Sequence, residues 1–161
     1  MSKETAKWIV KAQIDKYFTQ EHYDLGIIDE ILHLEGNTLL NEGIDLIWTL
    51  LCGGAGTNFA NANACIGVGD SSAAAAATQT GLQGTNIIYK GMDSGYPTYG
   101  TSQKATFKST YGSTEGNFTW NEWSISNGNS DAATNLNRKV EAMGTKASGS
   151  TWVLTVDVSL A

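Results

Sequence analysis

The chain has 161 residues, of which 41% are hydrophobic and only 16% are charged, and its formal net charge is −6. This length is typical of one domain that buries a real core. The acidic balance argues against non-specific nucleic-acid binding, because contact with phosphates needs a basic face.

Alternating hydrophobicity predicts a strand near the N-terminus. Trp8, Val10, Ala12 and Ile14 alternate with polar residues from position 7 onward, and this period of two places them on one face. A turn or long hairpin loop is expected over 17–26 and a second strand over 27–35. We treat residues 1–36 as N-terminal strands or an arm and residues 37–161 as a β-rich domain, together forming one compact unit.

Every Asp, Glu, Lys or Arg between positions 21 and 45 is acidic. These residues are Glu21, Asp24, Asp29, Glu30, Glu35, Glu42 and Asp45. Such a run favours a solvated face. A docking surface for a basic partner is the alternative that remains open.

One helix is predicted over about 41–52. Asn41 is the expected N-cap, and two glycines follow at 53 and 54 to end the helix. The apolar residues lie at i, i+3, i+4 and i+7, namely Ile44, Ile47, Trp48 and Leu51. Because other apolar residues occupy much of the remaining surface, we expect this helix to be buried or covered by another subunit.

The stretch from residue 51 to residue 89 carries a single charge, Asp70. Its small, neutral residues indicate close packing of backbones or a surface that another subunit covers. A strand is predicted over 65–69, and Asp70 or Ser71 is the expected cap of a short alanine-rich helix after it.

Further short strands follow at a spacing of about ten residues. They are predicted over 86–90, 103–111, 117–126, 136–143 and 150–161, with Gly-rich turns between them. The pattern predicts a mainly β fold, either an antiparallel β-sandwich or a jelly-roll-like barrel, with the one buried helix.

The chain carries no clear cofactor, metal or membrane signal. Residues 1–4 are not followed by the apolar segment of a signal peptide, and the longest apolar run, near 44–52, is too short to span a bilayer. Cys52 and Cys65 are expected to be buried free thiols. His22 and His33 do not have the spacing of zinc ligands.

Candidate catalytic residues are few. Glu115 and Glu122 could form a glycosidase pair beside Trp120 and Trp123, but we expect one Trp in the core and the other at a rim or interface. Arg138 is expected to pair with a carboxylate. We therefore predict no catalytic residues.

Several segments, in this order, resemble structural proteins of tailed bacteriophages. They are residues 39–44 (LLNEGI), 61–70 (NANACIGVGD), 111–115 (YGSTE), 120–123 (WNEW), 136–139 (LNRK), 144–146 (GTK) and 150–152 (STW). The resemblance covers most of the chain and implies a non-enzymatic virion protein, assembled in the host cytoplasm. Small β proteins of this kind are often head decoration, or cement, proteins that form trimers and bind the major capsid protein.

This interpretation assigns candidate contact residues. Those for the subunit interface are Ile44, Ile47, Trp48, Leu51, Phe59 and Ile66. Those for the capsid contact are Trp8, Val10, Glu30 and Glu35. A tail or fibre component that contacts host glycans is the alternative, with the candidates Tyr96, Tyr99, Trp120 and Trp123.

Overall fold

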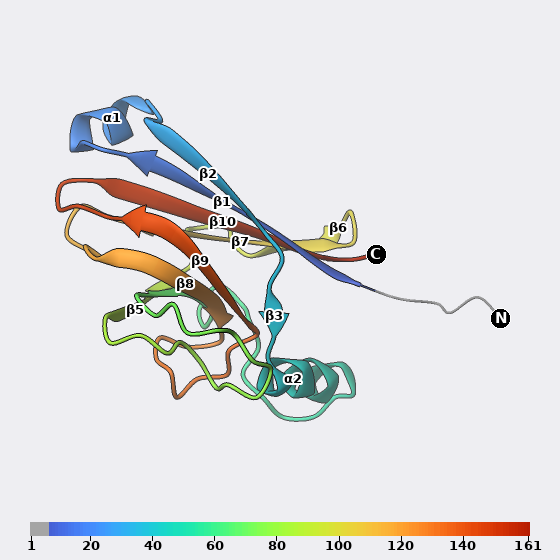
Figure 1. Ribbon diagram of the computed structural model, residues 1–161. Helices are drawn as coiled ribbons and strands as arrows, with labels where there is room; N and C mark the ends of the chain where they lie inside the picture. Colours follow the sequence, from blue (N-terminus) through green and yellow to red (C-terminus); the bar gives the residue numbers. More distant parts are fainter. Residues whose placement is uncertain (1–6) are drawn as a thin grey trace.

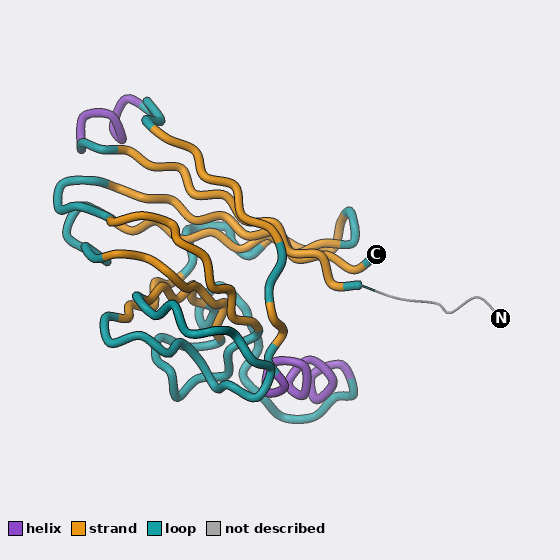
Figure 2. The backbone as a smooth tube through the Cα atoms, in the orientation of Figure 1, coloured by secondary structure: helices purple, strands orange, loops and turns teal. Residues whose placement is uncertain are grey.

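The computed structural model describes residues 7–161 and consists of two antiparallel sheets of five strands each, packed face to face (Figure 1). The predicted mainly β sandwich is thereby confirmed, and the strands that the structure describes do not close into a barrel. Residues 1–6 of the expected N-terminal arm lie outside the described residues. Figure 2 places most of the irregular chain around the second sheet.

The first sheet has the strand order β2-β1-β10-β7-β6. Its strands are β1 (Trp8–Tyr17), β2 (Glu30–Glu35), β6 (Thr98–Thr101), β7 (Lys104–Tyr111) and β10 (Thr151–Leu160). A short helix, α1 (Gln20–Leu25), lies between β1 and β2. The second predicted strand therefore begins three residues later than expected, because residues 27–29 belong to the turn that follows α1.

The second sheet has the order β3-β9-β8-β4-β5. Its strands are β3 (Thr38–Leu39), β4 (Cys65–Gly69), β5 (Ile87–Gly91), β8 (Thr119–Ser126) and β9 (Asn137–Thr145). The second helix, α2 (Asn41–Leu51), follows β3 and lies at the lower end of this sheet in Figure 1.

The alternating residues of β1 and β10 form one wall of the core. Val10, Ala12 and Ile14 are buried, and they lie opposite Val158, Val156 and Leu154 of β10. Each sheet thus turns one apolar face toward the other, and burial of these side chains is the main force that holds the sandwich together.

The pairing of β8 with β9 is irregular where two tryptophans enter the core. Trp120 pairs with Gly144 and Glu122 pairs with Val140, so β9 has three residues between these pairs and β8 has one. Trp120 and Trp123 both lie in the core, although they are three positions apart and would face opposite sides of a regular strand.

Lys146 fastens the two turns that connect the sheets. Its ammonium group donates to the carbonyl oxygens of Gly112 and Ser150 at 2.8 and 2.7 Å and to Oδ1 of Asn117 at 2.9 Å. The side chain is almost completely buried, and this burial lowers the pKa of Lys146 to about 8.

The predicted helix exists, but it is not buried. Within α2 only Gly43 is buried, whereas Trp48 and Leu51 are 59% and 70% exposed. Leu40, without a side-chain hydrogen bond, occupies the N-cap position in place of Asn41. Although apolar residues occur around most of the helix, only one side of α2 contacts the rest of the chain. The reason is that the helix is attached at the end of the sandwich and does not lie between the sheets.

The neutral stretch packs closely against the outer face of the second sheet. A Cβ atom on Gly67 would collide with the Tyr89 ring, and one on Gly69 would collide with the Glu122 carboxylate. Close packing, part of the first of the two expectations, occurs at β4 against side chains, whereas residues 51–58 of the same stretch are exposed. No alanine helix forms there, because Asp70 accepts hydrogen bonds from Thr85 and Asn86 instead of capping a helix.

Candidate docking surfaces

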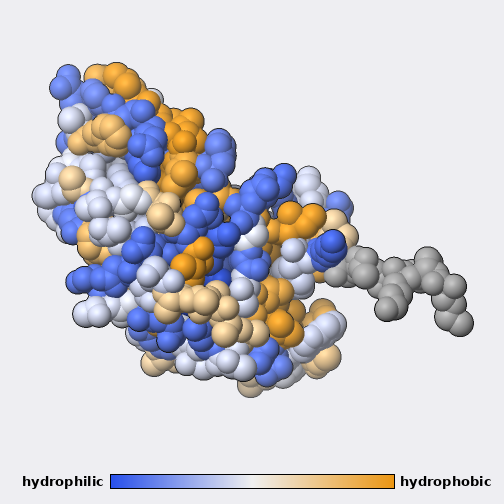
Figure 3. Space-filling model, in the orientation of Figure 1, coloured by the Kyte–Doolittle hydropathy of each residue, from blue (hydrophilic) through white to orange (hydrophobic). Residues whose placement is uncertain are grey.

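The exposed large apolar side chains gather at two ends of the sandwich. One group comprises Phe18, Tyr23, Leu25, Ile27, Ile28 and Ile31, and the other comprises Trp8, Ile9, Trp48, Leu51 and Leu160. The first group lies around α1 and β2, where Figure 3 shows a continuous orange patch at the top of the molecule. Contiguous exposed apolar surface of this kind marks interaction sites.

An open apolar groove lies near the two chain ends. It has a volume of about 530 Å³, and we call it the terminal groove. Its apolar lining is Trp8, Ile47, Phe59, Ala105, Phe107, Leu136, Val158 and Leu160, and its polar rim is Gly100, Thr101, Gln103, Lys104 and Ser159. The first sheet and α2 contribute to it, together with Phe59 and Leu136 from the loops before β4 and β9, so its shape is fixed by the fold.

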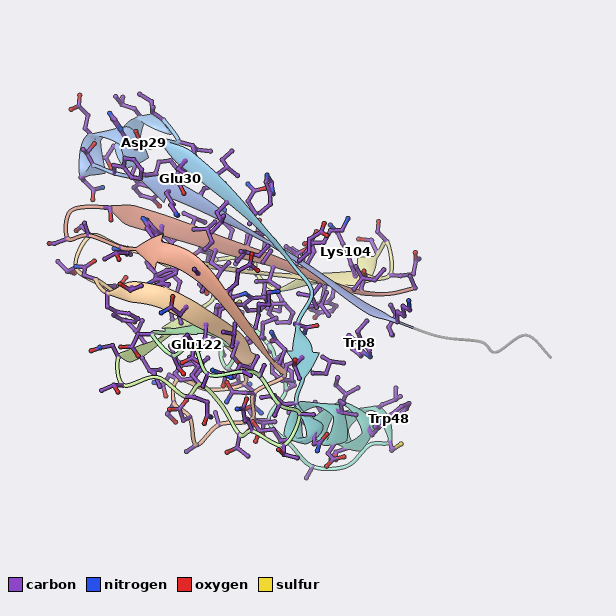
Figure 4. All side chains as sticks on the ribbon, in the orientation of Figure 1. Trp8, Asp29, Glu30, Trp48, Lys104 and Glu122 are labelled. Atoms are coloured by element: carbon purple, nitrogen blue, oxygen red, sulfur yellow. The ribbon has the colours of Figure 1, made fainter. Side chains whose placement is uncertain are left out.

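The N-terminal turn of α2 is anchored to the second sheet. The Glu42 carboxylate accepts a hydrogen bond of 2.7 Å from the backbone N–H of Asn135. Gly43 lies so close to the chain at Leu136 that a Cβ atom there would be 2.6 Å from the Leu136 Cα. Ile47 then faces the groove, while Trp48 and Leu51 form the outer face of α2 (Figure 4).

The second surface is the end of the β1–β2 hairpin, residues 18–31, which we call the hairpin tip. Figure 1 shows it at the top of the molecule, at the edge of the first sheet. It combines the six exposed apolar side chains named above with the acidic Glu21, Asp24, Asp29 and Glu30, and no Lys or Arg occurs between Lys16 and Lys90. This composition suits a partner surface that is apolar and basic.

Local hydrogen bonds hold the hairpin tip in one conformation. The Thr19 side chain caps α1 by accepting from the N–H of His22, and Gly26 ends α1 in the left-handed conformation. Asp29 accepts a hydrogen bond of 2.7 Å from the N–H of Phe18 and also contacts His22 Nδ1 at 2.8 Å. The Phe18 N–H, followed by the His22 side chain, holds the pKa of the Asp29 carboxyl below its usual value.

The structure brings part of the predicted subunit interface together. Ile47 and Phe59 line the terminal groove, and Trp48 and Leu51 lie beside it on the outer face of α2. Ile44, in the first turn of α2, is half-buried. Ile66 was wrongly assigned to the interface: it is fully buried, because its side chain belongs to the core between the two sheets.

The predicted capsid-contact residues are divided between the two surfaces. Trp8 lies in the terminal groove, whereas Glu30 and Glu35 are exposed on the edge strand β2. The Glu30 carboxylate also accepts a 2.6 Å hydrogen bond from the Lys16 ammonium. Val10 is not available for contact, because its alternation places it in the core at 3% exposure.

Two of the four glycan-contact candidates are likewise excluded by burial. Trp120 and Trp123 have no exposed surface, so they offer no platform for a sugar ring. Tyr99 is 78% exposed on the edge strand β6, and Tyr96 is half-buried beneath the Lys108 ammonium, which lies 5.5 Å from its ring centre.

Arg138 pairs with a carboxylate, as the sequence predicted, and its partner is Glu122. The two side chains are completely buried and joined by a hydrogen bond of 2.6 Å. Glu122 also accepts from the backbone N–H groups of Gln83 and Gly84, while Arg138 donates to the carbonyl oxygen of Ala73. This network fastens the neutral segment to the second sheet. Glu115, the other carboxylate considered for a glycosidase pair, forms a separate ion pair with Lys90.

The cysteines are both free, as expected, but only Cys65 is buried and Cys52 is exposed. Nowhere in residues 7–161 do three or more His, Cys, Asp or Glu side chains lie where they could hold a metal ion. Within the same residues, neither helix has the length and apolar character needed to cross a membrane.

Sequence reasoning missed the hairpin tip as an apolar surface. The signal was present, since Leu25, Ile27 and Ile28 surround a glycine at the boundary between the expected loop and the expected second strand. Apolar residues next to a turn have no long strand or helix face that would bury them, so they are expected to stay exposed.

No protein-family model matches the chain, and the searches of curated proteins and of solved structures also find no match.

Proposed function

We propose that this protein is a non-enzymatic structural component of a tailed-phage virion, a capsid decoration protein that binds and stabilises the lattice of the major capsid protein. The observation that carries the proposal is the pair of separate apolar surfaces on one rigid sandwich. A decoration protein needs one surface for the lattice and another for its own copies, for which a trimer is the favoured assembly. The resemblance of the sequence to phage structural proteins supports the same conclusion.

The hairpin tip is the proposed lattice contact. Its apolar residues are already ordered by the cap at Thr19 and by the hydrogen bonds of Asp29, so binding costs little conformational entropy. Among residues 7–161, the adjacent edge strand β2 has one side without a neighbouring strand, to which an extended segment of the lattice could pair. Since all formal charges on the tip are acidic, the lattice surface that receives it is expected to be basic.

Co-sedimentation with empty capsids of the phage that carries the gene tests this proposal. The protein is expected to pellet in a fixed ratio to the major capsid protein, and the coated capsids should resist heating better than bare ones. Protein that stays in the supernatant, or coated capsids that are no more resistant, would contradict the decoration function.

Matched variants locate the contact. Leu25→Ser combined with Ile27→Ser removes two exposed apolar side chains of the tip and should weaken capsid binding more than tenfold. Tyr99→Ser removes a still more exposed aromatic ring on β6 and should leave binding unchanged. Equal effects of both variants would refute the assignment of the tip.

A tail or fibre protein that binds host glycans is the second candidate, favoured by the exposure of Tyr99 at an edge strand. Aromatic rings in such positions stack on sugars. Gold labelling of virions distinguishes the two: label over the head supports decoration, whereas label at the tail tip or fibres supports the second candidate.

A further inference from the structure

The outer face of α2 is an apolar projection that the described chain leaves uncovered. Trp48 and Leu51 are three positions apart, so they lie on the same side of the helix. Both are more than half exposed, at 59% and 70%. The anchored N-terminal turn fixes their position, because Glu42 and Gly43 hold the helix against the chain at 135–136.

The terminal groove is the concave counterpart of this projection. Its volume of about 530 Å³ lies within the range of cavities that take up large apolar groups. Aromatic and aliphatic side chains form most of its lining, and Lys104 is the one formally charged residue on its rim. The Lys104 side chain is 43% exposed, and its ammonium forms a surface ion pair of 2.8 Å with Asp157.

The charges of the two features are complementary. The formally charged residues of α2 are Glu42 and Asp45, both acidic, whereas the charged residue of the groove is basic. The segment after α2 carries no charge before Asp70, so nothing on that side repels a second copy. One chain therefore contains an apolar projection with acidic neighbours and an apolar groove with a basic rim.

We propose that the terminal groove binds the outer face of α2 from a second copy of this chain, with Trp48 as the inserted side chain. This inference rests on the self-association that the proposed function includes, and it names the surfaces that join the copies. Asp45 of one copy then approaches Lys104 of the other. An aromatic side chain that enters a fully desolvated pocket is the typical centre of such an interface.

Two single variants separate the two halves of the contact. Trp48→Glu destroys the projection and leaves the groove intact, whereas Leu160→Glu places a charge in the groove and leaves the projection intact. Both side chains are at least half exposed, so the fold should tolerate the changes, and circular dichroism verifies it. Sedimentation velocity of the wild-type chain should show an assembly, and each variant should weaken it about 30-fold or more.

Mixing the two variants provides the decisive measurement. The mixture contains one intact projection and one intact groove, so assemblies that hold both variants should reappear at concentrations where each alone is monomeric. A monomeric wild-type chain, an assembly that survives either substitution, or a mixture that stays monomeric would each overturn the inference. Tyr99→Ser is the control and should leave the sedimentation unchanged.

Fluorescence gives an independent readout. Three of the five tryptophans are buried within the chain, and Trp8 and Trp48 are the exposed pair. Their emission should shift to shorter wavelength as the concentration rises through the association range, and an unchanged spectrum during association would contradict the proposed insertion.

Because capsid binding is measured separately, a chain that assembles but does not bind capsids would refute only the proposed function. A monomer that coats capsids would refute only this inference.

Discussion

The attachment of α2 to the second sheet can be tested at Gly43, where two effects have opposite signs. In a helix that is free of contacts, Gly→Ala stabilises by about 0.5–1 kcal/mol, because alanine loses less backbone entropy. Here a Cβ atom would lie 2.6 Å from Leu136 Cα, 2.7 Å from Leu136 O and 2.8 Å from Asn135 O. All three are backbone atoms, which cannot rotate away as a side chain can.

The steric cost should therefore exceed the gain in helix propensity. Overpacking costs about 1–3 kcal/mol, and contacts this short with backbone lie toward the upper end, so we expect Gly43→Ala to lower the free energy of unfolding by about 2 kcal/mol. For a chain of this size the midpoint of thermal unfolding should fall by about 4–8 °C.

Chemical denaturation followed by circular dichroism measures the effect. Gly91→Ala is the matched control, because no atom lies within 4 Å of the Cβ position there, and its effect should stay within about 0.5 kcal/mol. An increase in stability for Gly43→Ala would refute the reasoning, since it would mean that α2 does not pack on the chain at residues 135–136.

Three further predictions concern buried and charged groups. Arg138→Met leaves Glu122 buried without its cation and should cost about 3–5 kcal/mol in urea denaturation, part of which Glu122→Gln in the same chain should restore. Burial lowers the pKa of Lys146 from 10.5 to about 8. The native state then loses this proton before the unfolded chain does, so stability should rise by about 2 kcal/mol between about pH 8 and 9.5, and Lys146→Met should abolish the rise. The side-chain hydrogen bond from Asn86 holds the pKa of Asp70 below its usual value, so its contribution is present at neutral pH and lost as the carboxylate is protonated in acid. Asp70→Asn should therefore melt lower than wild type at pH 7, and the difference should shrink at about pH 3; a constant difference would contradict this assignment.

The strands were predictable where one face of the strand is buried in the core and the other is exposed to solvent. Ile14 and Leu154 belong to strands whose alternation follows their burial. The bounds of β10 agree with expectation to within one residue, whereas β1 extends to Tyr17, three residues past the end of the predicted alternation at Ile14. The helix was equally visible from its spacing. Its exposure was not, because hydrophobic periodicity shows which residues are apolar but not whether another element of the chain covers them.

The candidate surfaces were less accessible from sequence. The assignment of Trp120 and Trp123 failed where the pairing of β8 with β9 becomes irregular, and no pattern in the residues themselves marks that position. Arg138 was expected to pair with a carboxylate, but its partner depends on the pairing of β8 with β9. The terminal groove joins Trp8, Ile47 and Leu160, which only the tertiary fold brings together.

The pairing of β1 with β10 has a consequence for how this chain folds. The register joins Trp8 to Leu160 and Tyr17 to Thr151, so the two strands at opposite ends of the described chain are neighbours throughout their length. During synthesis β1 can form its hairpin with β2 at once, but its other edge stays open until β10 has left the ribosome. The first sheet therefore cannot close before β10 has been synthesised, and a nascent chain that stalls before β10 exposes the unpaired edges of both β1 and β7 to aggregation.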